Sequence, residues 1–471
     1  MNARTIGFVA GLAMFSATLI LPAPAGMASQ AWVVAGLVAL MAAWWMTEAI
    51  PLTATALMPF LVLPFAGIMT AKETASSYYS PTLFLILGGA FLALAIERTG
   101  LHRRLALALL EGLGSSGGAS RLLFAFMMAA AILSMAISNT STALIMMPMA
   151  VAVIEAGGIA EGERRGLAGA LPMGIAFAAS IGGLGTIVGS PTNAIAVALL
   201  DTTIGVRVSF AQWSLIGVPA VLLGIPLATW IISRTQAVAA HPFDIGGARE
   251  AIRVTPRWST PEKRLVPLVA VAFLLWMGTP LLAPLLPKGS LTDGTIAIGV
   301  SMLLFMLPDG TGRKLLNWAE ANRAPWDVIM MFGGGLALAE GMGRSGLADW
   351  LGQSLLPLSA VPLPLVALAI TAMVILITEF ASNVATASGI MPVVASLTVA
   401  LGVDPILLAM PAALAASWGF MLPAGTGPNA IAWATGRIEL PRMVRAGFLL
   451  DVTGAPMIVA VVWAMASLMG G

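Results

Sequence analysis

Long apolar segments with few charged residues dominate this sequence and decide what it can fold into. Eleven of them are predicted to be membrane-spanning helices, because about 20 mainly apolar residues in helical form cross a bilayer. Only 9% of the 471 residues are charged, against roughly 25% in a soluble domain. The sequence therefore predicts an all-α polytopic membrane protein, with spans at 6–22, 31–48, 51–68, 81–97, 167–200, 213–234, 265–286, 293–308, 326–342, 404–434 and 446–470.

Two further apolar stretches, at about 121–155 and 361–400, are expected to be re-entrant hairpins that return to the side from which they enter. With the N-terminus in the cytoplasm, this layout places 19 of the 23 basic residues on the cytoplasmic side, Arg323 among them. The positive-inside rule favours such an orientation. This orientation places the C-terminus outside. The membrane is expected to be a bacterial-type inner (plasma) membrane. A signal peptide over residues 4–25 is the alternative for the first segment, but a first span fits the topology better.

The chain contains an internal repeat. The segment that begins at Ser138 aligns with the one that begins at Ser382, 244 residues later, and 189–196 aligns with 425–432, 236 residues later. A third pair joins 88–101 to 333–347. The order of motifs is the same in both halves, and the predicted hairpins open from opposite sides of the membrane. This pattern indicates an inverted-topology repeat, which is the plan of many secondary transporters.

The repeat predicts how the chain is divided. Residues 1–234 would form a first half with an inward-opening hairpin and a broken helix at about 167–200. Residues 235–264 would form a cytoplasmic linker. Residues 265–471 would form a second half with an outward-opening hairpin and a broken helix at about 404–434.

The repeated motifs are candidates for a binding site. In each half one Asn follows a Ser at the hairpin tip, and a second Asn follows a Gly/Pro break. Broken helices are tolerated at membrane depth where they line a polar cavity or are buried in protein. Helix N-termini attract anions, and freed carbonyl and hydroxyl oxygens suit Na⁺. A single such motif is more often a helix cap or a packing kink, but four motifs in two matched pairs favour a site.

Several classes of function are excluded or disfavoured by composition. The chain has no cysteine and two histidines, so disulfides and thiolate sites are excluded and a histidine metal centre is not expected. Neither a nucleophile cluster nor a phosphate-binding Gly-Lys-Ser/Thr loop is present. We therefore expect neither an enzyme nor an ATP-driven pump, no organic cofactor and no nucleic-acid partner. An anion channel is the least favoured alternative, because paired broken helices form a site rather than a continuous pore.

Six short motifs give the chain a family resemblance. They are WWMTEAIP at 44–51, LGGAF at 87–91, SNT at 138–140, VGSPTNA at 188–194, TEFASN at 378–383, and the segment 421–430. With them the chain resembles the divalent anion/sodium symporter family, whose members carry dicarboxylates, citrate or sulfate. The resemblance implies a homodimer in which a transport domain moves against a scaffold like an elevator, with coupling to Na⁺. C4-type dicarboxylates are the expected substrates; a Na⁺-independent exchanger, or a citrate or sulfate carrier, is the alternative.

The resemblance also implies site residues. The first Na⁺ site would use Ser134, Ser138, Asn139 and the Gly189 carbonyl, and the second would use Thr378, the Ala381 carbonyl, Asn383 and the Gly425 carbonyl. The expected substrate-binding residues are Ser138, Asn139, Thr140, Ser190, Ser382, Asn383, Val384 and Thr426. This chain departs from relatives at Val384, where some have Thr, and at Gly427, where many have Pro.

Acidic residues within or near the spans are a further set of candidates. Ionisable groups at membrane depth are functional by default, so each could take part in cation coupling. Interfacial or helix-anchoring roles are the alternative for those near segment ends. The candidates are Glu48, Glu97, Glu340 and Glu379.

Overall fold

The computed structural model describes residues 2–114, 118–160, 162–241, 243, 244, 246, 247, 250 and 257–469. Within these ranges the chain is helical, and its one β-type pairing is an isolated bridge between Pro308 and Lys314. Nine segments in the described part are long and apolar enough to cross a membrane. They are α1 (Ala3–Ile20), α2 (Ser29–Thr47), α6 (Pro81–Thr99), α9 (Asn139–Ala156), α12 (Phe210–Thr235), α14 (Thr260–Leu282) with the 3₁₀ turn that follows it, α19 (Leu363–Phe380), α20 (Asn383–Leu401) and α23 (Leu440–Met469).

Further helices lie between these segments. They are α3 (Leu52–Thr55), α4 (Met58–Phe65), α5 (Ala71–Ser77), α7 (Leu101–Gly114), α8 (Ala119–Ser134), α10 (Leu167–Gly183), the 3₁₀ helix η1 (Ile187–Gly189), α11 (Pro191–Ile204), α15 (Asp293–Met306), α16 (Trp318–Ala321), α17 (Trp326–Ser345), α18 (Leu347–Leu355), α21 (Pro405–Ala415) and α22 (Gly427–Ala434). A helix or a helix pair lies at every predicted span and hairpin. The predicted polytopic all-α fold is therefore confirmed. The predicted linker at 235–264 falls partly outside the described residues.

The third predicted span, 51–68, was wrong as one continuous helix. The structure divides it into α3 and α4 at Ala56 and Leu57. Pro59 is the reason, because a proline nitrogen has no hydrogen to donate to the carbonyl one turn earlier. The break leaves the Ala56 carbonyl free to accept a hydrogen bond from the Tyr78 hydroxyl at 2.7 Å.

Both predicted broken helices are interrupted in the structure. α10 ends at Gly183 and α11 begins at Pro191, with η1 between them. α21 ends at Ala415 and α22 begins at Gly427. Proline in the first turn of α11 and of α22 suits a helix start, because the N–H that it lacks would have no partner there.

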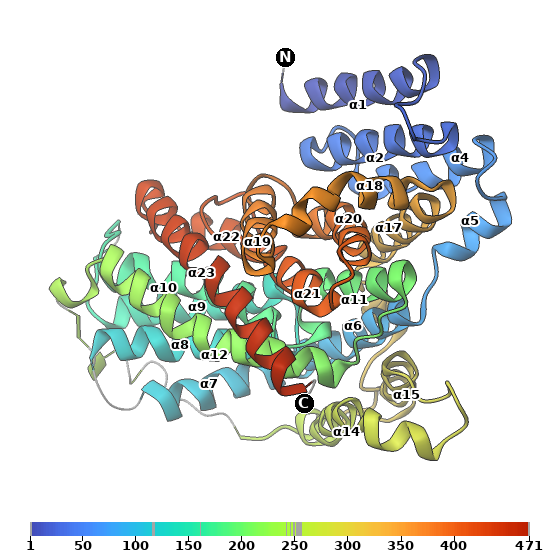
Figure 1. The fold of residues 1–471 in the computed structure, drawn as a ribbon. Coiled ribbons are helices and arrows are strands. Elements are labelled where there is room, and N and C mark those ends of the chain that lie inside the picture. Colours follow the sequence, from blue (N-terminus) through green and yellow to red (C-terminus); the bar gives the residue numbers. More distant parts are fainter. Residues whose placement is uncertain are drawn as a thin grey trace.

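The hairpins and the broken helices of the two halves interlock. α8 and α9 form the first hairpin; α9 packs against α10 of its own half and α22 of the other. α19 and α20 form the second hairpin, and α20 packs against α21 and α11. Figure 1 shows these elements gathered in the body of the molecule, with α1 and α2 side by side at one end. Each hairpin therefore contacts the broken helix of the opposite half.

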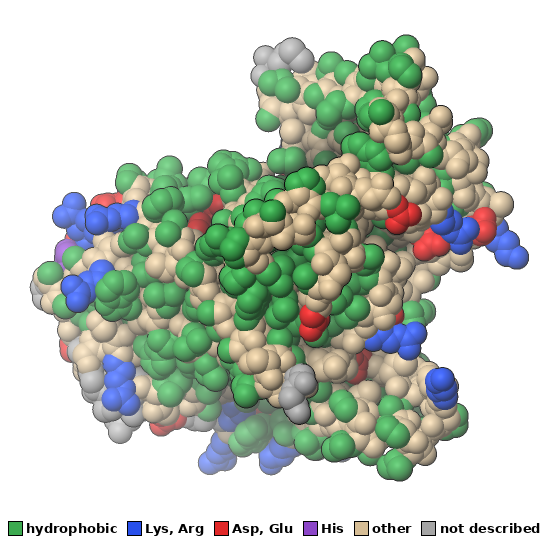
Figure 2. Space-filling model, viewed as in Figure 1, with side chains coloured by type: hydrophobic (Ala, Val, Ile, Leu, Met, Phe, Trp, Pro, Cys, Tyr) green, Lys and Arg blue, Asp and Glu red, His purple; other side chains and the backbone are tan. Residues whose placement is uncertain are grey.

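The surface fits a protein that lies in a bilayer. On the face drawn in Figure 2, hydrophobic side chains cover most of the middle, and Lys and Arg lie mainly toward the margins. Large apolar side chains such as Phe65, Leu274 and Leu281 are more than 70% exposed. Exposed apolar surface of this extent is unfavourable in water but not against lipid chains.

Candidate functional site

The tip of the first hairpin gathers oxygen atoms around one amide. α8 ends at Ser134 and α9 begins at Asn139. One atom of the Asn139 carboxamide lies 2.7 Å from the Ser134 hydroxyl and 3.1 Å from the carbonyl oxygens of both Ala179 and Gly189. If that atom is the amide nitrogen, it donates to these oxygens; if it is the oxygen, the group of oxygens needs a cation. These residues therefore fit a Na⁺ site.

Hydrogen bonds from two further side chains hold this oxygen cluster in place. The Thr186 hydroxyl donates to the Met135 carbonyl at 2.5 Å and accepts from the Gly189 amide at 3.0 Å. The Asn193 amide nitrogen donates to the carbonyls of Gly183 and Thr186 at 2.7 and 2.8 Å. A Cβ on Gly189 would lie 2.6 Å from the Gly183 oxygen. Only glycine fits there, so the Gly189 carbonyl can approach Asn139.

The second hairpin tip brings the corresponding residues together, but around a hydroxyl instead of an amide. The Thr378 hydroxyl lies 2.8 Å from Asn383 Oδ1 and 2.8 Å from the Ala416 carbonyl oxygen. Thr378, Asn383 and Ala416 correspond to Ser134, Asn139 and Ala179 in the repeat. Ala381 ends α19 directly before the tip, and a Cβ on Gly425 would lie 3.5 Å from the Glu379 carbonyl oxygen.

The Glu379 carboxylate holds the unwound part of the second broken helix. It is 2% exposed and accepts hydrogen bonds from the backbone N–H groups of Phe420, Met421 and Leu422. The carboxyl group of Asp451, on α23, lies against it. The corresponding position in the first half is Met135, whose carbonyl accepts from Thr186. The two halves therefore fix their breaks by different chemistry.

The other acidic candidates lie in ion pairs near helix ends. Glu48 pairs with Arg4 at 3.3 Å, and both are more than half exposed. Glu340 pairs with Arg344 at 2.7 Å. Glu97 pairs with Arg323 at 3.9 Å and borders a cavity. Of the four candidates, only Glu379 is buried beside a hairpin tip, and a role in coupling remains a prediction for each.

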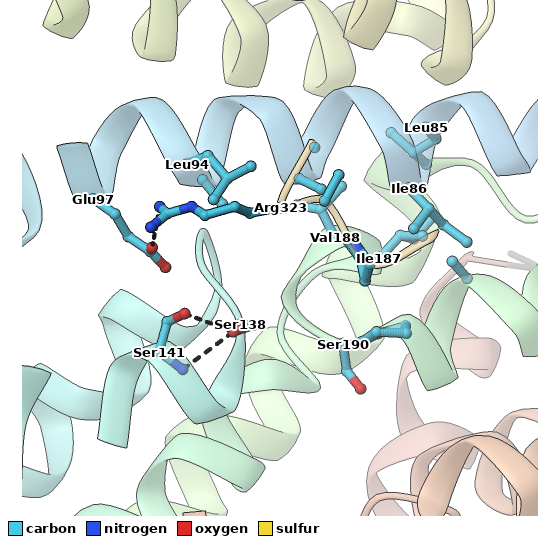
Figure 3. A pocket seen from close by; sticks show the side chains of 17 residues that line it. Leu85, Ile86, Leu94, Glu97, Ser138, Ser141, Ile187, Val188, Ser190 and Arg323 are labelled. Carbon is cyan, nitrogen blue, oxygen red and sulfur yellow. Dashed lines mark hydrogen bonds and ion pairs between the residues drawn. The ribbon is translucent and has the colours of Figure 1, made fainter. Parts of the chain in front are cut away.

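A cavity of about 300 Å³ lies beside the first hairpin tip. Figure 3 shows Ser138 and Ser141 from the tip and Ser190 from the start of α11 on one side, with Glu97 and Arg323 opposite. Of the eight predicted substrate residues, Ser138 and Ser190 are among its lining residues.

The remaining predicted substrate residues lie elsewhere around the two tips. Thr140 meets the second broken helix, because a Cβ on Gly427 would lie 2.5 Å from its hydroxyl oxygen. Ser382 and Thr426 are N-caps, accepting from the amides of Ala385 and Asn429 at 3.1 and 3.2 Å. Val384 is half-buried against two apolar clusters. Thr140 thus contacts the opposite half at Gly427, whereas Asn139 and Asn383 contact groups of their own halves. Val384 is not among the residues that line the cavity.

Some site residues were not predicted from the sequence. The Ala179 and Ala416 carbonyls lie beside the two tips, yet a carbonyl has no side-chain signature. The signal that could have found them is a further repeat, Ala-Ala-Ser at 178–180 and 415–417. Thr186 has no counterpart in the second half, so the repeat could not reveal it.

Two interrupted helices that meet two hairpin tips around clustered oxygens define a membrane transport protein rather than an enzyme. A sequence profile of the sodium:sulfate symporter transmembrane region matches residues 2–469. This chain belongs to that family of sodium-coupled secondary transporters.

Named relatives support the assignment. The chain is 38% identical to the sodium-dependent dicarboxylate transporter SdcS of Staphylococcus saprophyticus, over 98% of this chain and 91% of that protein. It is also 38% identical to the protein of the same name from Staphylococcus aureus, with the same coverage. Among solved structures, the YdaH transporter of Alcanivorax borkumensis has a similar fold, with a TM-score of 0.60 and 15% identity over 98% of both chains.

Proposed function

We propose that this protein carries small divalent anions, most favourably C4-type dicarboxylates, across a bacterial plasma membrane together with Na⁺. The observation that carries the proposal is the matched pair of tips. At each tip an Asn carboxamide meets a hydroxyl, and a backbone carbonyl lies against the carboxamide in the first tip and against the hydroxyl in the second. The sodium-dependent dicarboxylate transporters that it resembles support both the ion and the substrate class.

The charge of the tips explains why cations would be needed. The tip motifs and the broken-helix motifs contain no Lys or Arg. A dianion there would be attracted by the N-termini of α9, α11, α20 and α22, which provide partial positive charge and free N–H groups. Those partial charges are smaller than two full negative charges. Na⁺ ions bound beside Asn139 and Asn383 would supply the remaining charge, so substrate and cations would bind together.

Ser134, Ser138, Asn139 and the Gly189 carbonyl would form the first Na⁺ site. Thr378, Asn383 and the carbonyls of Ala381 and Gly425 would form the second. The hydroxyl and amide groups of Ser138, Thr140, Ser190, Ser382 and Thr426 would contact the carboxylates. Alternating access would follow from movement of the hairpins and broken helices, as an elevator within a homodimer, with the N-terminus in the cytoplasm and the C-terminus outside.

Sulfate remains a second candidate substrate, because the family profile is that of a sodium:sulfate symporter. Uptake of labelled succinate into proteoliposomes, driven by an inward Na⁺ gradient or by the same gradient of K⁺, tests the proposal. Unlabelled malate, fumarate, citrate and sulfate serve as competitors. We expect Na⁺-dependent accumulation of succinate that malate and fumarate inhibit most strongly. Equal uptake in K⁺, stimulated by internal succinate, would instead indicate an exchanger.

A further inference from the structure

The wall of the cavity opposite the hairpin tip holds one positive and one negative side chain. Glu97 lies in the last turn of α6, and Arg323 lies just after α16. Among the described residues that line the cavity, these two are the charged ones. Figure 3 shows their side chains facing each other across from Ser138, Ser141 and Ser190. Both residues belong to segments that the topology places on the cytoplasmic side.

The Arg323–Glu97 pair is loosely held. Its closest nitrogen–oxygen distance is 3.9 Å, and the Arg323 side chain is 63% exposed. Exposed pairs at this separation contribute little and are easily exchanged. Arg98, on the same turn of α6, differs: it is largely buried, pairs with Asp309 and donates to the carbonyls of Lys314 and Leu315. Arg98 therefore holds the fold together, whereas Arg323 can change partner at small cost.

We propose that Arg323 binds a carboxylate of the substrate on the cytoplasmic side and exchanges it for Glu97 when the substrate leaves. This inference rests on the proposed function and on the predicted orientation of the chain. A guanidinium presents paired N–H donors that match the two oxygens of a carboxylate. The tip motifs contain no basic residue, so Arg323 would supply the full positive charge on this path.

Glu97 has a distinct part in this exchange. When the cavity is empty, its carboxylate neutralises Arg323. When a dianion enters, the two anions compete for one guanidinium. Competition weakens binding and speeds release into the cytoplasm. Replacing Glu97 by Gln removes the competitor, so substrate should bind more tightly from that side alone.

The alternative is a purely structural role, in which the Arg323–Glu97 pair only connects α6 to the segment before α17. A purely mechanical tie would affect stability, and it would affect transport from both faces. An anion-binding role affects the cytoplasmic face selectively. Comparison of transport from the two faces therefore distinguishes the anion-binding role from the structural role.

The test measures Na⁺-driven succinate transport in right-side-out and everted membrane vesicles, which present the outer and the cytoplasmic face. The variants are Arg323→Gln, Glu97→Gln and Arg323→Lys, with Arg313→Gln as the matched control. Arg313 belongs to the same cytoplasmic segment, is 45% exposed and pairs with Glu320 outside the cavity. We expect Arg323→Gln to raise the KM at the cytoplasmic face by about five- to tenfold, because a contact made by a side chain that is 63% exposed is partly screened by water. The KM at the outer face should stay within about twofold of wild type, a change too small to reflect a lost contact.

Glu97→Gln should lower the cytoplasmic KM, and Arg323→Lys should recover part of the loss. If Arg323→Gln behaves like Arg313→Gln on both faces, the inference is wrong although the proposed function stands. Loss on both faces that Arg323→Lys does not restore would show a structural role and would also overturn it. A wild-type protein that transports no succinate would overturn the proposed function, and this inference with it.

Discussion

The carboxylate of Glu379 accepts a hydrogen bond from the backbone N–H of Met421, 2.9 Å away, across the gap between the second hairpin and the second broken helix. Phe420 and Leu422 donate to the same carboxylate. One buried acidic side chain thus satisfies three successive amides that no helix satisfies. It holds the segment that leads to Gly425 and Thr426.

Glu379→Gln should impair transport strongly. A glutamine presents one oxygen and an NH₂ group, and the NH₂ would face amide donors. Each lost hydrogen bond to a charged group costs about 1.5–3 kcal/mol. We therefore expect the Na⁺ concentration for half-maximal succinate uptake to rise by at least about tenfold. Glu250→Gln, at an exposed position, is the matched control and should transport normally; equal behaviour of the two variants would contradict this role.

Asp451→Asn should preserve or raise the melting temperature of the protein in detergent. Neither carboxyl oxygen of Asp451 accepts a hydrogen bond from another described residue, although its side chain is only 5% exposed. An asparagine amide can donate to the neighbouring Glu379 carboxylate, which removes a conflict between two acidic groups. A fall in melting temperature of more than a few degrees would show that a carboxyl group is needed at position 451 and that an amide cannot replace it.

Asp309 makes the stability of the segment before α16 sensitive to acid. Burial would raise the pKa of Asp309, but hydrogen bonds from Arg98 and Thr311 outweigh it and hold the pKa well below the ordinary value of 3.8. A carboxyl whose pKa is lowered by folding stabilises the protein above the unfolded value, and this contribution is lost as the pH falls below about 4.

Asp309→Asn should therefore lower the melting temperature at pH 7 by about 3 °C or more. The difference from wild type should shrink toward pH 3. Asp349→Asn, at an exposed position, should match wild type at both pH values. A difference between Asp309→Asn and wild type that is independent of pH would rule out the ionised carboxylate as its cause.

Gly427 is expected to be required for its lack of a side chain. A Cβ there would lie 2.5 Å from the Thr140 hydroxyl oxygen, closer than any ordinary contact. Gly427→Ala should push the first hairpin tip away from α22 and lower the rate of succinate uptake by about tenfold, as for a displaced binding group. Gly343→Ala, at a helical glycine whose Cβ position meets no atom within 4 Å, is the control. Wild-type uptake by Gly427→Ala would show that the first hairpin tip and α22 can move apart without loss of transport.

The sequence was informative about the repeated elements because their chemistry is local. Glycine and proline mark the breaks before α11 and α22, and Ser-Asn marks both tips, so hairpins and broken helices could be predicted. The repeat also predicted which residues correspond. Ser138 and Ser382 show the limit of motif reading, because each also caps the helix that it begins.

Other features depend on contacts between distant segments. Nothing in the pattern around Glu379 indicates that it binds amides 41 to 43 residues later. The packing of Val384 against two apolar clusters likewise depends on how α20 meets its neighbours. The amphipathic helix α7 was not predicted as an element because it is too polar for a span.

The most direct test of the account is Na⁺ activation of succinate uptake by Asn139→Ala and Asn383→Ala in proteoliposomes, beside wild type and Asn2→Ala. Asn2 caps α1 at the exposed end of the molecule, so its variant should show normal activation. Each tip variant should keep its melting temperature within a few degrees of wild type and lose Na⁺-dependent uptake, because one cation site loses the amide that lies against its hydroxyl. Folded tip variants that take up succinate with the Na⁺ dependence of wild type would contradict the account.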